Sequence, residues 1–81
     1  MFAPNPKTLA IFVQSRRKKL KLNQSQVAKK VGLKQKTISS FENHPENAKV
    51  STLFKILSAL EMDLNVLPKE ADPNARWDLE W

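Results

Sequence analysis

The chain has 81 residues and a formal net charge of +6, which leaves room for one small domain with a core built mostly from helices packed on helices. It contains no cysteine and one histidine, which excludes a disulfide framework, a thiolate metal site and a multi-histidine zinc site. Residues 1–49 carry eleven Lys or Arg against two acids, whereas residues 50–81 carry three against six. A basic half is typical of proteins that contact phosphates, although a solvated lysine-rich surface gives the same pattern.

The first predicted helix starts at Asn5 and Pro6, a capping residue followed by proline at the first helical position, and runs to about Lys19. One face of this helix is apolar, with Leu9, Phe12, Val13 and Leu20. The run from Leu9 to Val13 is too short to span a membrane or to form a typical signal core. We therefore expect a cytoplasmic protein.

A basic cluster crowds the end of this first helix. It consists of Arg16, Arg17, Lys18, Lys19 and Lys21. Cations at this place stabilise the negative end of the helix dipole, so capping and solvation alone would account for them. Phosphate contact by Arg16 or Arg17 is the functional alternative, and a membrane-surface helix is a third, which the modest apolar face makes weaker.

Residues 24–41 predict two short helices that meet at a tight turn. Gly32, the only glycine of the chain, suits the left-handed conformation that ends a helix. Small residues at the turn let two helices approach at about 90 to 120°. Apolar residues at helical spacing point each helix inward, and these are Val27, Val31, Ile38 and Phe41. The pattern predicts a helix-turn-helix.

The polar side of this motif offers candidate DNA contacts. Asn23 is the expected cap of the second helix, which places Gln24 at an N-terminus suited to a phosphate oxygen. Because Ile38 must turn inward, Gln35, Lys36 and Ser39 fall on the exposed side of the third helix. Gln can pair with adenine N6 and N7, and Lys can donate to guanine O6 and N7. The alternative for Gln35 is an ordinary solvated residue at a helix start.

After a loop at residues 43–47, Ser51 is the expected cap of a fourth helix. This helix has an apolar stripe at i, i+3, i+4 and i+7, namely Leu53, Ile56, Leu57 and Leu60. Phe54 lies off the centre of the stripe, and periodicity leaves open whether it belongs to the core or to a subunit interface.

Beyond Leu60 the period changes from helical to alternating. Met62, Leu64 and Val66 alternate with other residues before Pro68, which predicts one short strand at residues 63–67. A lone strand needs a partner for its backbone groups. We expect that partner to be the same strand of a second copy across a two-fold axis, formed by Asp63, Leu64, Asn65, Val66 and Leu67.

The chain divides into residues 1–68, for DNA binding and dimerisation, and a flexible tail at 69–81. The tail has no periodicity and is expected to be disordered in isolation, yet it contains Trp77 and Trp81. Tryptophan is a frequent anchor at interfaces, which favours a peptide that enters a partner's pocket. Folding back onto the dimer's own core is the open alternative.

Residues 9–67 resemble the lambda-repressor-like helix-turn-helix family of phage repressors and Xre-type regulators. Within it, residues 28–43, residues 52–57 and the terminal Leu79-Glu-Trp81 are similar to the HipB-type antitoxins, which partner HipA-type serine/threonine kinases. The resemblance implies an all-α, four-helix domain that dimerises and represses a palindromic operator of its own toxin–antitoxin operon. It also implies that the protein holds the kinase inactive.

The resemblance further implies roles for particular residues. The base-contacting positions are Lys34, Gln35, Lys36 and Ser39. The phosphate-facing positions are Gln24 and Ser25, residues 63–67 form the dimer lid, and Leu79 and Trp81 lie in the kinase-binding tail, with Trp81 as its anchor.

Other functions explain the sequence less well. A stand-alone Xre-type repressor without a kinase would use the same DNA surface and leave the tail without a role. An enzyme is not expected, because the chain lacks nucleophile–base pairs and a glycine-rich phosphate loop, and no cofactor is expected. An RNA-binding protein or a membrane-surface helix would show no preference for palindromic DNA.

Overall fold

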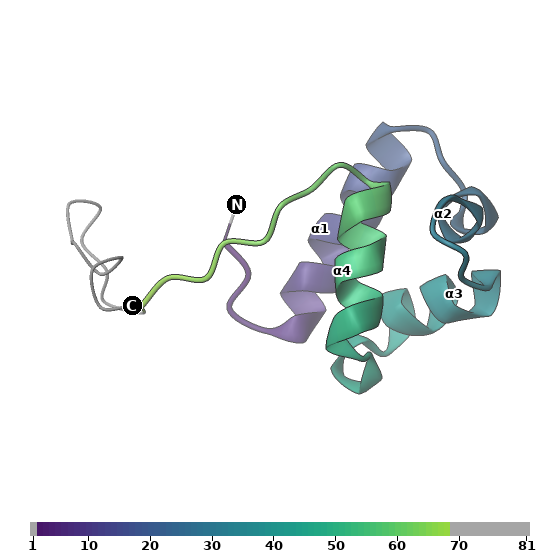
Figure 1. The fold of residues 1–81 in the computed structure, drawn as a ribbon. Helices are drawn as coiled ribbons and strands as arrows, with labels where there is room; N and C mark the ends of the chain where they lie inside the picture. The colour runs from purple at the N-terminus through teal and green to yellow at the C-terminus, as the bar shows by residue number, and fades with distance from the viewer. Residues whose placement is uncertain (1, 69–81) are drawn as a thin grey trace.

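The computed structural model describes residues 2–68, which form a small group of short helices (Figure 1). In chain order these are α1 (Pro6–Lys19), α2 (Gln24–Lys30), α3 (Gln35–Asn43), a 3-10 turn η1 (Pro45–Asn47) and α4 (Val50–Ala59). Helix α2 packs against α3 and α4, and α1 packs against α3 and η1. The predicted all-α fold with four α-helices is therefore confirmed for residues 2–68. None of the described helices is both long and apolar enough to cross a bilayer.

Asparagine side chains begin the first two helices, as predicted. The Asn5 side chain accepts a hydrogen bond from the Thr8 backbone N–H at 2.9 Å, directly before Pro6. The Asn23 side chain accepts from the Gln26 N–H at 2.7 Å, while the Gln26 side chain accepts from the Asn23 N–H at 2.8 Å. This reciprocal pair is a capping box, which satisfies two otherwise unpaired donors.

The start of α4 differs from the prediction. Ser51 lies inside the helix, and the N-cap is Lys49, which makes no side-chain capping bond. A capping side chain stabilises a helix start without being required for it, because packing of the apolar stripe supplies most of the stability of a helix in a protein. No capping residue therefore marks the start of α4 in the sequence.

Three helices, α1, α2 and α4, are each followed by a residue in the left-handed conformation two positions after their last residue. Gly32 has φ +68°, as the prediction required, and the N–H of Leu33 bonds back to the carbonyl of Ala28 at 2.9 Å. The ends of α1 and α4 have the same 6→1 bond, although their left-handed residues are Lys21 (φ 60°) and Glu61 (φ 56°). Each end satisfies a carbonyl that the helix leaves free.

One apolar cluster joins all four helices. Its buried members are Ala10, Val13, Val27, Ala28, Ile38, Phe41, Ile56, Leu57 and Leu60. Removing a large apolar side chain from water contributes about 1.5–3 kcal/mol, so these residues hold α2 and α3 at a fixed angle. The predicted inward faces of α2, α3 and α4 are confirmed, whereas Phe54 is 52% exposed and lies outside this core.

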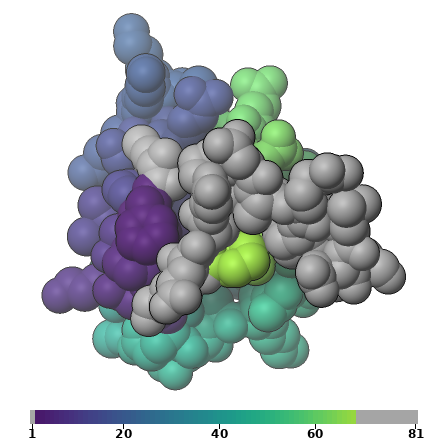
Figure 2. All heavy atoms as spheres, turned by 90° about the vertical axis from the view of Figure 1, so that its left-hand side faces the viewer, coloured from purple at the N-terminus to yellow at the C-terminus, as the bar shows by residue number. Residues whose placement is uncertain are grey.

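The expected strand at residues 63–67 is not formed in this chain. Residues 62–68 are neither helix nor strand, because a strand needs a neighbouring strand to pair its N–H and C=O groups and no other strand exists among residues 2–68. The segment leaves the end of α4 and extends away from the helices, on the side opposite α2 and α3 and past the N-terminal residues (Figure 1). Figure 2 views that side, where the N-terminal residues and the end of the segment both reach the surface.

The segment also carries exposed apolar side chains. Val66 is 70% and Leu67 61% exposed, and Phe2 is exposed as well. The predicted tail residues Trp77, Leu79 and Trp81 lie outside the described residues.

Candidate nucleic-acid interface

Helices α2 and α3 present a polar and basic outer surface. Ile38 and Phe41 fill the inner side of α3, so Lys34, Gln35 and Lys36 are exposed at its start and Ser39 is half-buried one turn later. Residues 24–41 contain four lysines and no acid. The start of α3 therefore offers hydrogen-bond donors and positive charge without competing surface carboxylates, as contact with the edges and phosphates of a DNA duplex requires.

The structure brings together several of the predicted site residues. Gln35 Nε2 donates to Gln24 Oε1 at 2.6 Å, which joins the first residue of α3 to the first residue of α2. A shallow hollow at the start of α2 is lined by Arg17, Asn23, Gln24, Ser25 and Gln35. The predicted phosphate-facing residues and the predicted base-contacting Gln35 thus share one surface.

Arg17 has a role that the sequence interpretation missed. Its Nε and Nη2 donate to the two carboxylate oxygens of Glu42 at 2.7 and 3.1 Å, and its Nη1 donates to the carbonyl of Leu22 at 2.9 Å. The side chains of Arg17 and Glu42 are only 11% and 2% exposed. The guanidinium thus makes three hydrogen bonds inside the protein, which argues against a phosphate contact of Arg17. Because Arg17 also lines the hollow beside Gln24, that contact stays a prediction.

A positional signal for this pair does exist in the sequence. Arg17 lies at i+4 from Val13 and i−3 from Leu20, on the apolar stripe of α1, and Glu42 lies at i+4 from Ile38. Spacing alone therefore places both charges on inward faces, where a charge must find a partner.

The other predicted contacts are less constrained. Arg16 is half-buried, and its Nε donates to the carbonyl of Leu60 at 3.1 Å, so it links α1 to the end of α4. The phosphate contact of Arg16 stays a prediction, and the N–H groups that do not bond to Leu60 are the ones that would make it. Ser25 is exposed beside Gln24.

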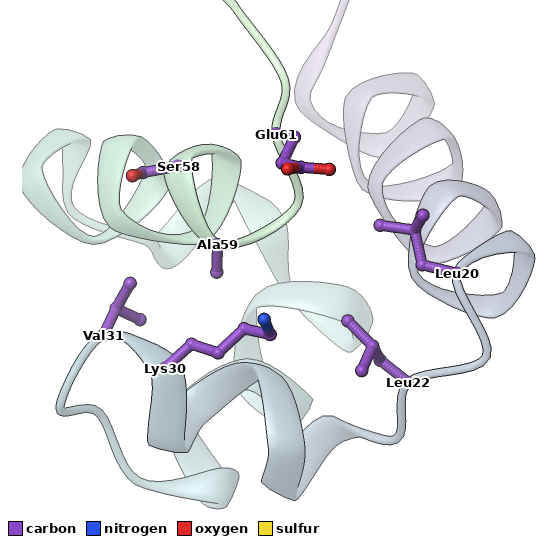
Figure 3. A pocket seen from close by; sticks show the side chains of 7 residues that line it. All are labelled: Leu20, Leu22, Lys30, Val31, Ser58, Ala59 and Glu61. Carbon is purple, nitrogen blue, oxygen red and sulfur yellow. The ribbon is translucent and has the colours of Figure 1, made fainter.

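A second hollow lies between the end of α1, α2 and the end of α4 (Figure 3). Its lining is Leu20, Leu22, Lys30, Val31, Ser58, Ala59 and Glu61. None of these is a predicted contact residue. The described residues contain no group of three His, Asp or Glu placed to hold a metal ion. The exposed start of α3 is therefore the candidate site.

Two helices that meet at a left-handed glycine, the second with an exposed polar and basic start, define the helix-turn-helix class of proteins. A helix-turn-helix family model matches residues 13–67. The chain is 44% identical over 80 residues, 95% of its length and 85% of the relative, to antitoxin HipB of Escherichia coli O6:H1 strain CFT073. It is 41% identical to antitoxin HipB of Escherichia coli K12 over 95% of its length and 91% of that relative.

Solved structures give the same result. A chain from a HipB–O4 20mer complex superposes with a TM-score of 0.83 at 38% identity, covering 86% of this chain and 99% of that one. A chain from a HipA–HipB–O2–O3 complex superposes with the same score, identity and coverage. The chain belongs to the helix-turn-helix family and, within it, to the HipB antitoxins.

Proposed function

We propose that this chain is the antitoxin of a toxin–antitoxin pair, a dimeric repressor of its own operator that also binds and neutralises a HipA-type serine/threonine kinase. The observation that carries the proposal is the exposed, basic start of α3 with Gln35 held by Gln24 at 2.6 Å. Proteins of this class place the start of that helix in the major groove. The expected place of action is the cytoplasm, where operator DNA lies.

The proposal assigns separate tasks to the exposed residues. Gln35 contacts an adenine through its amide, Lys34 and Lys36 donate to guanine acceptors, and Ser39 adds a permissive contact. Gln24, Ser25 and Arg16 position the protein on phosphates, which provides affinity without sequence preference.

Dimerisation is the second part of the proposal. Pairing of residues 63–67 with the same residues of a second copy would satisfy their backbone groups and cover Val66 and Leu67, which are exposed in the single chain. Val50 and Phe54, one turn apart on α4, are also exposed and offer further apolar surface. A two-fold dimer presents two copies of α3 to successive major-groove faces about 34 Å apart.

Kinase binding is the third part. Its support is the family membership, together with the HipA–HipB–O2–O3 complex among the similar structures. Leu79 and Trp81 are the proposed contacts, and they lie outside the described residues. The alternative is a stand-alone Xre-type repressor, which would bind the same DNA without a kinase.

DNA binding tests the central claim. Fluorescence anisotropy would compare a duplex from the region upstream of this chain's own gene with a scrambled duplex of equal length and composition. We expect Gln35→Ala to lose about 1–3 kcal/mol on the upstream duplex and little on the scrambled one, because it removes a base contact and no charge. Ser58→Ala, an exposed change on α4, is the matched control and should alter neither.

Equal affinity of the wild type for both duplexes would refute the repressor proposal, and equal losses on both would refute the role of Gln35. Light scattering on the free protein measures its mass. A monomer would contradict the proposed strand pairing.

A further inference from the structure

Four side chains form one continuous chain of hydrogen bonds from the interior to the candidate DNA surface. Arg17 donates twice to Glu42. Gln24 Nε2 donates to Glu42 Oε1 at 3.1 Å, and Gln35 Nε2 donates to Gln24 Oε1 at 2.6 Å. The chain starts at a buried ion pair and ends at the exposed first residue of α3.

Only one direction of hydrogen-bond donation is compatible with this series of four side chains. A guanidinium has no acceptor and a carboxylate has no donor, so Glu42 accepts from both Arg17 and Gln24. Gln24 must therefore turn its nitrogen toward Glu42 and its oxygen toward Gln35. Gln35 must in turn donate with its nitrogen. Because the Glu42 side chain is 2% exposed, water has little access to reverse this order.

The direction decides what Gln35 offers to a base. Its oxygen and one N–H remain free, which gives one acceptor beside one donor. Adenine presents a donor at N6 beside an acceptor at N7, whereas guanine presents acceptors at both O6 and N7. With its amide reversed, Gln35 would offer two N–H donors to the groove, which suits guanine. The orientation of the Gln35 amide is thus a choice between two purines.

We propose that Glu42 is a specificity-determining positioning residue: it fixes the amide orientation of Gln24 and Gln35, so that Gln35 selects adenine over guanine. This inference rests on the proposed contact between Gln35 and DNA. Glu42 itself touches no base.

Three variants break the chain of bonds at different places. Glu42→Gln keeps the shape and allows either amide orientation, but it leaves the buried Arg17 without its charge partner and can unfold the protein. The double variant Arg17→Met with Glu42→Gln removes both charges and avoids that penalty. Gln24→Ala leaves the ion pair intact and disconnects Gln35 from it.

The measurement is the ratio of dissociation constants for adenine and guanine at one base pair of one half-site. That base pair is the one at which a base substitution weakens DNA binding by the wild type but leaves DNA binding by the Gln35→Ala variant unchanged. The wild type should prefer adenine by roughly 5- to 150-fold. In Gln24→Ala and in the double variant the ratio should fall to within about threefold of unity, while the ratios at other base pairs stay at the wild-type value.

Val13→Ala is the matched control, because it destabilises the core without touching the hydrogen-bonded chain and should retain the wild-type ratio. Variants that bind more weakly but keep the wild-type preference for adenine would overturn the inference while leaving the repressor proposal intact. A wild type that prefers guanine at this base pair would overturn it as well. A wild type that binds upstream and scrambled DNA equally would overturn the proposed function, and the inference with it.

Discussion

Arg17 carries its charge inside the group of helices, where it donates three hydrogen bonds, two to the Glu42 carboxylate and one to the carbonyl of Leu22. Desolvating both charges costs free energy that their mutual attraction largely offsets, so the pair as a whole adds little net stability. Either charge alone, however, would be buried without a partner. The ion pair therefore joins α1 to α3, and the third hydrogen bond of Arg17 ties it to the carbonyl of Leu22 just after α1.

We expect Arg17→Met to lower the free energy of unfolding by about 3–5 kcal/mol, because it leaves the Glu42 carboxylate buried and unpaired. Urea denaturation followed by circular dichroism measures the change. Arg17→Met combined with Glu42→Leu should recover most of the loss, and Lys18→Met, at an exposed position next to Arg17, should stay within about 0.5 kcal/mol of the wild type. An Arg17→Met protein as stable as the wild type would contradict the assignment.

At the residue scale, the sequence predicts exposure better than partnership. The outward placement of Gln35 and Lys36 follows from the inward placement of Ile38, which helical periodicity gives directly. The bonds that join Gln24, Gln35 and Glu42 are not predictable in this way, because they depend on the angle between α2 and α3. That angle is set by packing of the whole core.

At the scale of the element, the helix ends follow one geometry with different residues. Gly32 adopts the left-handed conformation at no steric cost, and a Cβ there would meet no atom within 4 Å. Lys21 and Glu61 adopt the same conformation with a side chain, which costs roughly 1–2 kcal/mol per residue. The connections after α1 and α4 thus retain strain that the glycine connection avoids.

We expect Glu61→Gly to raise the free energy of unfolding by about 1 kcal/mol, because it relieves the left-handed backbone and removes a negative charge from the negative end of α4. Thermal denaturation measures the effect. The control is Lys55→Gly in the exposed middle of α4, which should lower stability by about 0.5–1 kcal/mol. Loss of stability in both variants would show that the conformation at Glu61 carries no cost.

The ends of helices were predictable from the sequence only where the residue type has a strong preference for that position. Asn5, Asn23 and Gly32 have strong positional preferences, and the structure confirms each. Lys49 before α4 and Lys21 after α1 have none, since packing of the neighbouring apolar residues decides where those helices begin and end. The error of two positions at Ser51 has the same cause.

At the scale of the whole molecule, the candidate DNA surface lies apart from the segment that is expected to pair in a dimer. The basic start of α3 lies on one side, and the segment from residue 62 to residue 68 lies on the opposite side (Figure 1). The alternating pattern of Leu64 and Val66 predicts a strand, but a strand is completed only by a partner. An alternating pattern predicts which side chains share one face of a strand, but it does not identify the strand that pairs with it.

We expect deletion of residues 77–81 to leave operator affinity unchanged and to weaken binding to a HipA-type kinase encoded beside this chain's gene by at least tenfold, because it removes Leu79 and both tryptophans. Isothermal titration calorimetry with the purified kinase measures the loss. Trp77→Ala and Trp81→Ala, compared individually, separate the two aromatic residues. Kinase affinity that survives the deletion would argue against the tail as the anchor and favour a different kinase-binding surface, whereas no kinase binding by the intact chain would favour the stand-alone repressor.

The segment at residues 62–68 leaves α4, the last helix of the described residues, on the side away from the start of α3 (Figure 1). On the proposal that the kinase binds the tail beyond residue 68 and the operator binds the start of α3, the two ligands use different parts of the chain. We therefore expect operator binding and kinase binding to occur at the same time instead of competing. We expect a change in the amount of free kinase to leave the repressor bound to its operator.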